Sequence, residues 1–223
     1  MESIPKFVIT IDKTRLRNFN KRLESGLGWK ATPFQGLRKK KVGCTLSHLK
    51  LWRHIVRHKE KFGPAAIIFE DDAACARPFT EADDLALRSF MQDHSVAVLQ
   101  LGWSPFFTHG RQKNATYHVG NSLDAHAYVV KTSSLQRYLD AYGSMFCSRY
   151  HQSLAPVGTN DTIFLINLVG IVSPMLFIQQ NNRRYANIRN IDIANRSWFH
   201  HVCMRIFIVV NYIWIQHNAR KLR

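Results

Sequence analysis

The sequence predicts an α/β fold with a mainly parallel central sheet flanked by helices, and three observations support this prediction. Short apolar runs, rich in β-branched residues, recur along the first 130 residues, which is typical of strands buried on both faces. Segments with helical periodicity lie between several of these runs, as in βαβ units. The 223-residue chain is 46% hydrophobic and 12% aromatic, the composition of a folded domain and not of a disordered or fibrous chain.

The expected strands and helices alternate along the chain. Four apolar runs are predicted to be strands: residues 7–11, 65–69, 96–101 and 125–130. Three segments are predicted to be helices: residues 14–25, 46–56 and 133–142. A basic loop with Pro33 and Gly36 separates the first two helices. We expect one domain over residues 1–181, followed by a basic C-terminal extension, residues 182–223, with an apolar and aromatic helix.

Positive charge is concentrated at the two ends of the chain. There are 31 Lys and Arg against 15 Asp and Glu, a formal charge of +16. Residues 1–62 carry +12, residues 63–182 carry −3 and residues 183–223 carry +7. An acidic middle between basic flanks favours a carboxylate site with anion contacts from the flanks. The alternative is a basic nucleic-acid-binding module, although the sequence has no helix-turn-helix, RRM or zinc-finger pattern.

Cysteine spacing and hydropathy disfavour several other classes. The four cysteines, at positions 44, 75, 147 and 203, form no C-x-x-C pair and have no zinc-module spacing, which argues against a disulfide-stapled scaffold. The N-terminal apolar run is too short for a signal peptide, and the longest apolar stretch, residues 163–178, is too short for a membrane span. We therefore expect a cytoplasmic protein whose C-terminal extension makes peripheral contact with an anionic inner membrane.

Three consecutive carboxylates, Glu70-Asp71-Asp72, follow the strand predicted at residues 65–69. Ligands of open α/β sheets bind beyond the carboxyl ends of the strands. Adjacent carboxylates raise one another's pKa values unless a cation neutralises them, and oxygen ligands suit Mg²⁺ or Mn²⁺. The tripeptide therefore indicates a metal site or, as the alternative, a solvated acidic turn.

Two motifs occur in a specific order, about 20 residues apart: G-C-T-L-S-H-L-K-L-W at residues 43–52 and I-I-F-E-D-D-A at residues 67–73. Through them the chain resembles glycosyltransferase family 25, the family of lipopolysaccharide β-galactosyltransferases and the related procollagen galactosyltransferases. Shorter pieces agree with this resemblance: F-V-I at residues 7–9, Arg15, Arg17, residues 99–102, residues 125–130, Asn160-Asp161, Ser173-Pro174 and Gln179-Gln180.

The resemblance implies a GT-A-type, Rossmann-like nucleotide-sugar-binding fold in residues 1–181, which would then be the catalytic domain. It also implies an inverting, metal-dependent transfer of a hexose, most often galactose from UDP-galactose, to a hydroxyl of a glycan or glycoconjugate such as lipopolysaccharide. Asp72 is then expected to bind Mn²⁺ or Mg²⁺ directly. Glu70 or Asp71 is expected to support it, with Asp71 as a further metal ligand.

The chemistry of sugar transfer suggests further site residues. Arg15 and Arg17, just beyond the first strand, and His48, near the start of a helix, are expected to contact the donor diphosphate. Inversion also needs a general base, for which Asp161 is the candidate and Asp124 the alternative. Each has a structural alternative, a helix N-cap for Asp161 and a loop acid for Asp124. An inactive relative that keeps the acidic motif is the last alternative.

Overall fold

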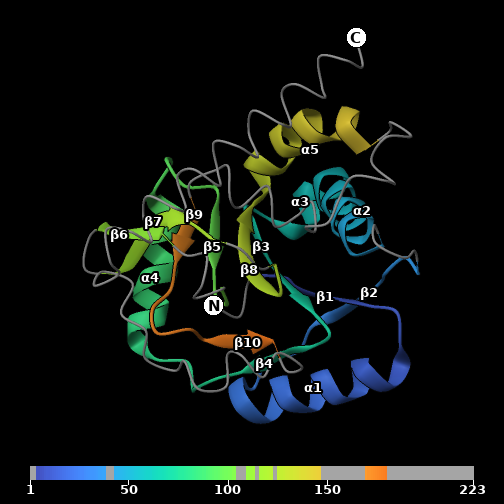
Figure 1. Cartoon of the computed structure of the whole chain (residues 1–223), viewed down its shortest axis with the longest axis horizontal. Helices are drawn as coiled ribbons and strands as arrows, with labels where there is room; N and C mark the ends of the chain where they lie inside the picture. Colours follow the sequence, from blue (N-terminus) through green and yellow to red (C-terminus); the bar gives the residue numbers. More distant parts are fainter. Residues whose placement is uncertain are drawn as a thin grey trace.

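A mixed eight-stranded sheet organises the described part of this computed structural model, residues 4–38, 43–103, 109–113, 116–122, 125–146 and 169–179 (Figure 1). In spatial order the strands are β2 (Thr32–Gln35), β1 (Lys6–Thr10), β3 (Ala65–Glu70), β8 (Ala127–Lys131), β5 (Val98–Gln100), β9 (Val169–Ile171), β7 (Tyr117–Asn121) and β6 (His109–Lys113). A second, two-stranded antiparallel sheet pairs β4 (Ala73–Cys75) with β10 (Phe177–Gln179).

Six strands of the large sheet point in one direction. β2, β1 and β3 are parallel neighbours, and β5 and β9 form a second parallel pair. β8 and β7 run antiparallel to the strands on either side of them. The α/β class is thus confirmed, but the sheet is mixed where the sequence predicted it to be mainly parallel. The apolar run at residues 125–130 indicates a buried strand without indicating its direction.

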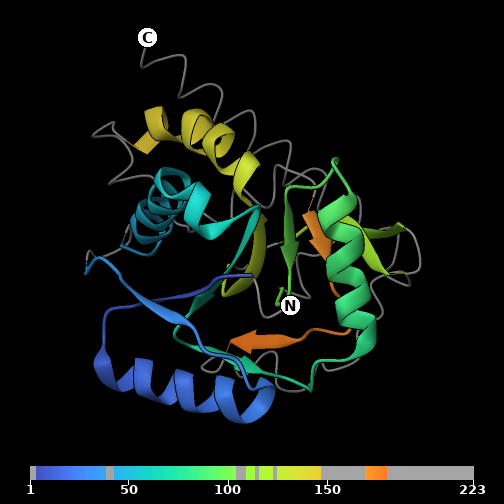
Figure 2. The ribbon, with the colours of Figure 1, turned by 180° about the vertical axis from the view of Figure 1, so that it is seen from behind.

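Helices cover both faces of the sheet (Figures 1 and 2). α1 (Lys13–Leu27) and α4 (Glu81–Gln92) pack on one face, and α2 (Gly43–Arg57) and α5 (Thr132–Phe146) pack on the other. Each face of the sheet has its own hydrophobic core, to which alternate strand residues contribute. Val8, Ile67 and Phe69 belong to the core under α1 and α4, and Phe7, Ile9 and Ile68 belong to the core under α2 and α5. A short helix, α3 (Lys59–Phe62), follows α2. Among the described residues, no helix has the length and hydropathy to cross a membrane.

All four predicted strands and all three predicted helices are present, with shifted ends. Local sequence patterns did not predict β2 and α4, nor the short elements α3, β4, β6, β7, β9 and β10. β2 is an edge strand with Pro33 and mostly exposed residues, so it lacks the apolar pattern of a buried strand. α4 opens with acidic residues, and its sequence signal is the capping box of Thr80 and Asp83. The predicted C-terminal extension lies outside the described residues.

Asp83 ties the start of α4 to the chain around it. Its carboxylate accepts hydrogen bonds from the Thr80 backbone N–H and hydroxyl, each at 2.8 Å, and from two guanidinium nitrogens of Arg77, each at 2.6 Å. Burial opposes the charge, but the hydrogen bonds from Arg77 and Thr80 prevail and lower the pKa of Asp83. Arg77 also donates to the Pro174 carbonyl oxygen at 2.8 Å. The ionised carboxylate therefore stabilises the fold.

We expect Asp83→Ala to lower the free energy of unfolding by about 2–4 kcal/mol, because it removes a helix cap and the partner of a half-buried arginine. Chemical denaturation measures this change. Asp84→Ala is the matched control, since it removes another acid of the first turn of α4, whose partner Arg88 is 75% exposed, and should cost less than about 1 kcal/mol. The ionised Asp83 carboxylate contributes its full stabilisation at pH values above 3.8, the ordinary pKa of the group. This stabilisation is lost as the pH falls from 3.8 through the lowered pKa of the folded protein. The difference in the free energy of unfolding between wild type and Asp83→Ala should therefore become smaller in acid, and a difference that does not change with pH would contradict this account.

Candidate functional site

The carboxyl ends of β1 and β3 meet at one edge of the large sheet. The two strands are parallel neighbours with Ile9 opposite Glu70, and the next residues along the chain are Thr10, at the end of β1, and Asp71, just after β3. α1 begins directly after β1, because the Asp12 side chain accepts hydrogen bonds from the backbone N–H groups of Thr14 at 2.7 Å and Arg15 at 2.9 Å. This turn carries Arg15 to the end of β3.

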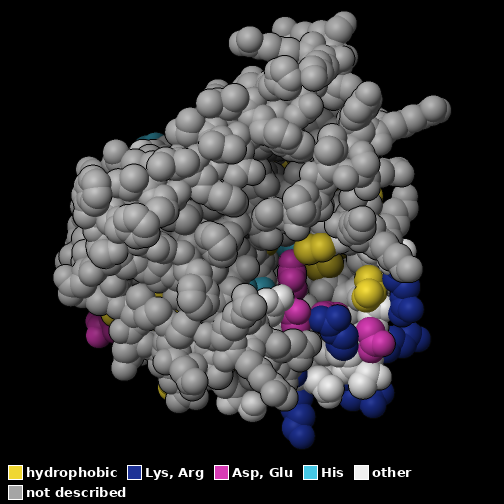
Figure 3. Space-filling view, viewed as in Figure 1, with side chains coloured by type: hydrophobic (Ala, Val, Ile, Leu, Met, Phe, Trp, Pro, Cys, Tyr) yellow, Lys and Arg dark blue, Asp and Glu magenta, His cyan; other side chains and the backbone are white. Residues whose placement is uncertain are grey.

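A pocket of about 210 Å³ opens at this edge. Acidic and basic side chains lie close together in the hollowed part of the surface, beside a few hydrophobic side chains (Figure 3). The lining comes from β1 and the residues after it, the start of α2 and the end of β3: Ile9, Thr10, Ile11, Arg15, Leu37, Gly43, Cys44, Ser47, Glu70, Asp71 and Asp72. Carboxylates beside an arginine suit a ligand that combines an anion with a cation.

Asp71 is the buried member of the carboxylate cluster, with 6% of its surface exposed. Its Oδ2 accepts a hydrogen bond from the Thr10 hydroxyl at 2.7 Å, and its Oδ1 forms an ion pair with Arg15. Arg22 Nη2 donates to the Asp71 carbonyl oxygen at 3.3 Å. Both carboxylate oxygens are therefore engaged, and Asp71 holds Arg15 and the turn after β3 in place.

Asp72 has a carboxylate oxygen that no described residue satisfies. Its Oδ1 is buried without a hydrogen-bond partner, whereas its Oδ2 accepts from Gln179 Nε2 at 3.2 Å and lies 3.5 Å from Arg15 Nη2. Burial and the charge of Glu70 raise the pKa of Asp72. A buried oxygen without a partner is costly, and a divalent cation with oxygen ligands would satisfy it. Asp72 therefore fits the Mn²⁺ or Mg²⁺ that the family resemblance implies.

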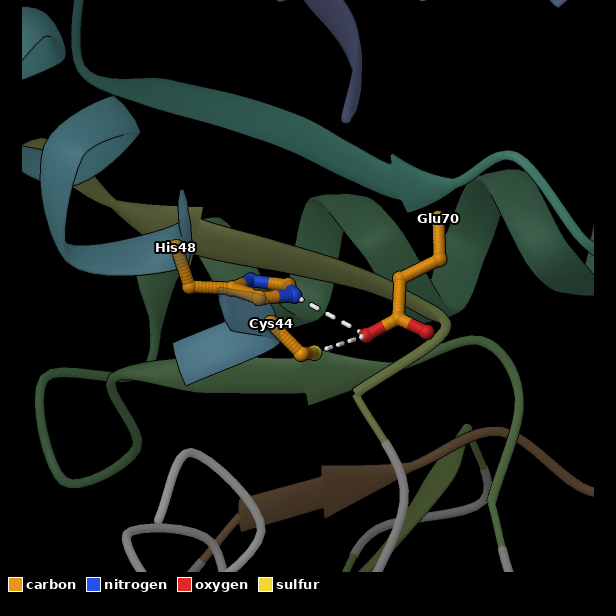
Figure 4. Close-up of side chains that lie close together, drawn as sticks. All are labelled: Cys44, His48 and Glu70. Carbon is orange, nitrogen blue, oxygen red and sulfur yellow. Dashed lines mark hydrogen bonds and ion pairs between the residues drawn. The ribbon is translucent and has the colours of Figure 1, made fainter. Parts of the chain in front are cut away.

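Glu70 belongs to a separate group with the first turn of α2 (Figure 4). Cys44 Sγ and His48 Nε2 each lie 3.0 Å from Glu70 Oε1. Burial opposes the charge of Glu70, but the hydrogen bonds and charge of His48, with the bond from Cys44, lower the pKa of Glu70 to about 2. Glu70 is therefore ionised near neutral pH and accepts both hydrogen bonds. So low a pKa also makes it a poor proton acceptor in catalysis.

His48 is fully buried on α2, and both of its ring nitrogens have partners. Besides the contact with Glu70, Nδ1 lies 2.8 Å from the Tyr128 hydroxyl, which accepts a hydrogen bond from Trp52 Nε1 at 2.8 Å. Because ionised Glu70 can only accept, the hydrogen bond to it places a proton on Nε2, and in the neutral ring the Tyr128 hydroxyl then donates to Nδ1. The structure thus brings His48 to Glu70, whereas the sequence analysis predicted a contact with the donor diphosphate.

The other predicted residues lie apart from this group or outside the described chain. Arg17 is exposed on α1 and is not part of the pocket lining. Asp124 and Asp161 lie outside the described residues, so their roles stay predictions. Four residues of the site were not predicted from the sequence: Thr10, Cys44, Tyr128 and Gln179. Only Cys44 carried a local signal, its four-residue spacing from His48, which places both on one face of a helix.

The fold and the site define an α/β protein whose ligand pocket lies at the carboxyl ends of adjacent parallel strands. The family model of glycosyltransferase family 25 (LPS biosynthesis protein) matches residues 6–145, more than half of the chain, and the protein therefore belongs to this family. The matched range contains Arg15, Cys44, His48 and all three carboxylates. Membership supports glycosyltransferase activity with a nucleotide-sugar donor and a glycan or lipid-linked acceptor. A comparison with curated proteins gave no match.

Proposed function

We propose that this family 25 protein is an inverting glycosyltransferase that uses Mn²⁺ or Mg²⁺ to move a hexose onto a hydroxyl of a glycan or glycoconjugate. Galactose from UDP-galactose is the first candidate donor, and lipopolysaccharide is the first candidate acceptor. The observation that carries the proposal is the buried Oδ1 of Asp72, for which the described residues provide no partner; Asp72 lines the same pocket as Arg15. A GT-A-type arrangement of the donor site and peripheral contact of residues 182–223 with an anionic membrane are parts of the same proposal.

Asp72 and Arg15 would bind the donor diphosphate in different ways, Asp72 through the cation and Arg15 by direct contact with phosphate oxygens. Asp72 holds the cation through Oδ1, and a bound Mn²⁺ or Mg²⁺ supplies stabilisation of the charge that develops on the departing diphosphate. Arg15 is 45% exposed although it pairs with Asp71, so part of its guanidinium remains accessible to phosphate oxygens. Asp71 positions Arg15, and Gln179 positions the Asp72 carboxylate.

Inversion requires a base that removes the proton of the acceptor hydroxyl on the face opposite the leaving group. Glu70 is unsuited to this step, because its pKa of about 2 makes protonation unfavourable near neutral pH. We propose Asp161 for this role, with Asp124 as the alternative. Asparagine at the position of the base should remove turnover and leave donor binding unchanged, whereas asparagine at the other position should leave both unchanged.

Donor and metal dependence can be tested on the whole chain by thermal shift and turnover. UDP-galactose with Mn²⁺ should raise the melting temperature more than either alone, because a ligand of the folded state stabilises it. UDP release in the presence of an acceptor should stop in EDTA and return with added Mn²⁺. UDP-glucose, UDP-N-acetylglucosamine and GDP-mannose serve as comparison donors. Full turnover in EDTA would overturn the metal requirement, and no shift with any nucleotide sugar would overturn the donor site.

A further inference from the structure

We propose that Cys44, His48 and Glu70 form a zinc site, distinct in ligand chemistry from the Mn²⁺ or Mg²⁺ position at Asp72. The three ligand atoms, Sγ, Nε2 and a carboxylate oxygen, all lie within 4.8 Å of one another. Two side chains from α2 and one from the end of β3 converge on a single point (Figure 4). This proposal goes beyond the transferase function and does not depend on it.

The spacing of the ligand atoms fits a small tetrahedral ion. Cys44 Sγ and His48 Nε2 each lie 3.0 Å from Glu70 Oε1. Around Zn²⁺, with bonds of about 2.0–2.3 Å, neighbouring ligand atoms are roughly 3.3–3.8 Å apart. A separation of the side chains by a few tenths of an ångström would therefore admit the ion, and Cys44, which is exposed, has room for this movement.

The network behind His48 suits a metal ligand. Zinc at Nε2 requires the ring proton on Nδ1, where the Tyr128 oxygen, 2.8 Å away, can accept it. The hydrogen bond from Trp52 Nε1 fixes the Tyr128 hydroxyl in turn. Binding would release the Cys44 thiol proton to solvent and move the ring proton of neutral His48 from Nε2 to Nδ1, so that Sγ and Nε2 are both free of protons. Without zinc, Cys44 and His48 each donate a hydrogen bond to Glu70. With zinc bound, all three side chains would coordinate the cation instead.

The types of ligand atom distinguish this zinc site from the proposed Mn²⁺ or Mg²⁺ position at Asp72. A thiolate, an imidazole and a carboxylate together favour Zn²⁺, whereas a site with only oxygen ligands favours Mg²⁺ or Mn²⁺. Three protein ligands leave a fourth coordination position. Cys44 and Glu70 both line the pocket, so water or a ligand donor atom in the pocket could supply the fourth ligand.

Cobalt titration of the full-length, metal-stripped protein tests the proposal. Four-coordinate Co²⁺ with a thiolate ligand gives a near-ultraviolet sulfur-to-metal band and strong visible bands, and added Zn²⁺ should displace it. Cys44→Ser should remove the sulfur band and weaken Zn²⁺ binding more than about 100-fold, because changes behind the ligands alone cost about 10- to 100-fold. Glu70→Gln should weaken Zn²⁺ binding and keep the sulfur band at saturating Co²⁺.

Cys75→Ser is the matched control, because Cys75 lies on β4 and is not part of the cluster. It should keep both the spectrum and the zinc affinity. Cys44 is exposed, so its serine variant should fold, which circular dichroism and a melting curve verify. Absence of the sulfur band in wild type, its persistence in Cys44→Ser, or equal zinc affinity in the two serine variants would each overturn the proposal.

The two proposals fail separately. A cobalt spectrum without a melting shift from any of the nucleotide sugars with Mn²⁺ would support the zinc site and overturn the donor site. A donor-dependent shift without the cobalt spectrum would do the reverse. Asp72→Asn should retain the cobalt spectrum, because Asp72 supplies no ligand atom to the cluster.

Discussion

Asp72→Asn is expected to lower metal-dependent sugar transfer by about 100- to 1000-fold, a loss typical of removing one charge-stabilising group. Asparagine keeps the size of the side chain but removes the negative charge that would hold the cation. Asp72 Oδ1 is buried without a partner among the described residues, so asparagine breaks no hydrogen bond to them at that atom. The measurement is kcat/KM for UDP release over a range of Mn²⁺ concentrations.

The stability of Asp72→Asn separates a functional loss from a folding defect. Burial and the charge of Glu70 raise the pKa of Asp72 in the folded protein, so its ionised form at neutral pH costs folding free energy. Removing that charge should leave the free energy of unfolding at pH 7 equal to that of wild type or higher. Activity within tenfold of wild type would contradict the assignment, and so would a variant that loses activity only because it unfolds.

Arg15→Gln is expected to weaken binding of UDP-galactose with Mn²⁺ by about 10- to 100-fold, the worth of one charge-assisted contact with phosphate. Arg15 lines the pocket and pairs with Asp71, so its guanidinium is held where a diphosphate would lie beside Asp72. Arg15→Lys keeps the charge and loses the two-pronged geometry, and should fall between glutamine and wild type. Calorimetric titration of the donor measures these affinities.

Arg17→Gln is the matched control for Arg15. Arg17 stands two residues further along α1, is exposed and is not part of the pocket lining. The two substitutions remove the same charge from the same helix, so long-range electrostatics should change alike. We expect Arg17→Gln to weaken donor binding less than about twofold, because distant exposed charges are screened by salt. Such a result would show that the position of Arg15, and not the net charge, determines donor affinity. Equal losses in both variants would contradict the special position of Arg15.

Local sequence patterns predicted the elements that carry the site. The apolar run of β3 ends in three carboxylates, and the helical spacing of Leu49, Trp52 and Ile55 indicated α2, where all three are buried. The sequence therefore located the acidic cluster at the carboxyl end of a strand, which is where the structure places the pocket. These features depend on neighbours within a few residues and can be read from one chain.

The division of roles among the carboxylates could not be predicted, because it depends on distant residues. Asp71 is satisfied by Thr10, 61 residues away, and Asp72 contacts Gln179, 107 residues away. Cys44 meets Glu70 across 26 residues and from a different element. The antiparallel direction of β8 likewise depends on how the chain returns between β3 and β5.

Three consecutive residues, the last of β3 and the two that follow it, contact three different parts of the molecule. Glu70 contacts α2, Asp71 contacts β1 and α1, and Asp72 contacts β10. A displacement of β3 by one residue against β1 would exchange all three partners at once and reverse which side chains face each core. The pairing of Ile9 with Glu70 therefore sets the partners of all three carboxylates. A single-residue insertion or deletion within β3 would disrupt both proposed cation positions together. A substitution of Cys44 or of Asp72 would affect only one of them.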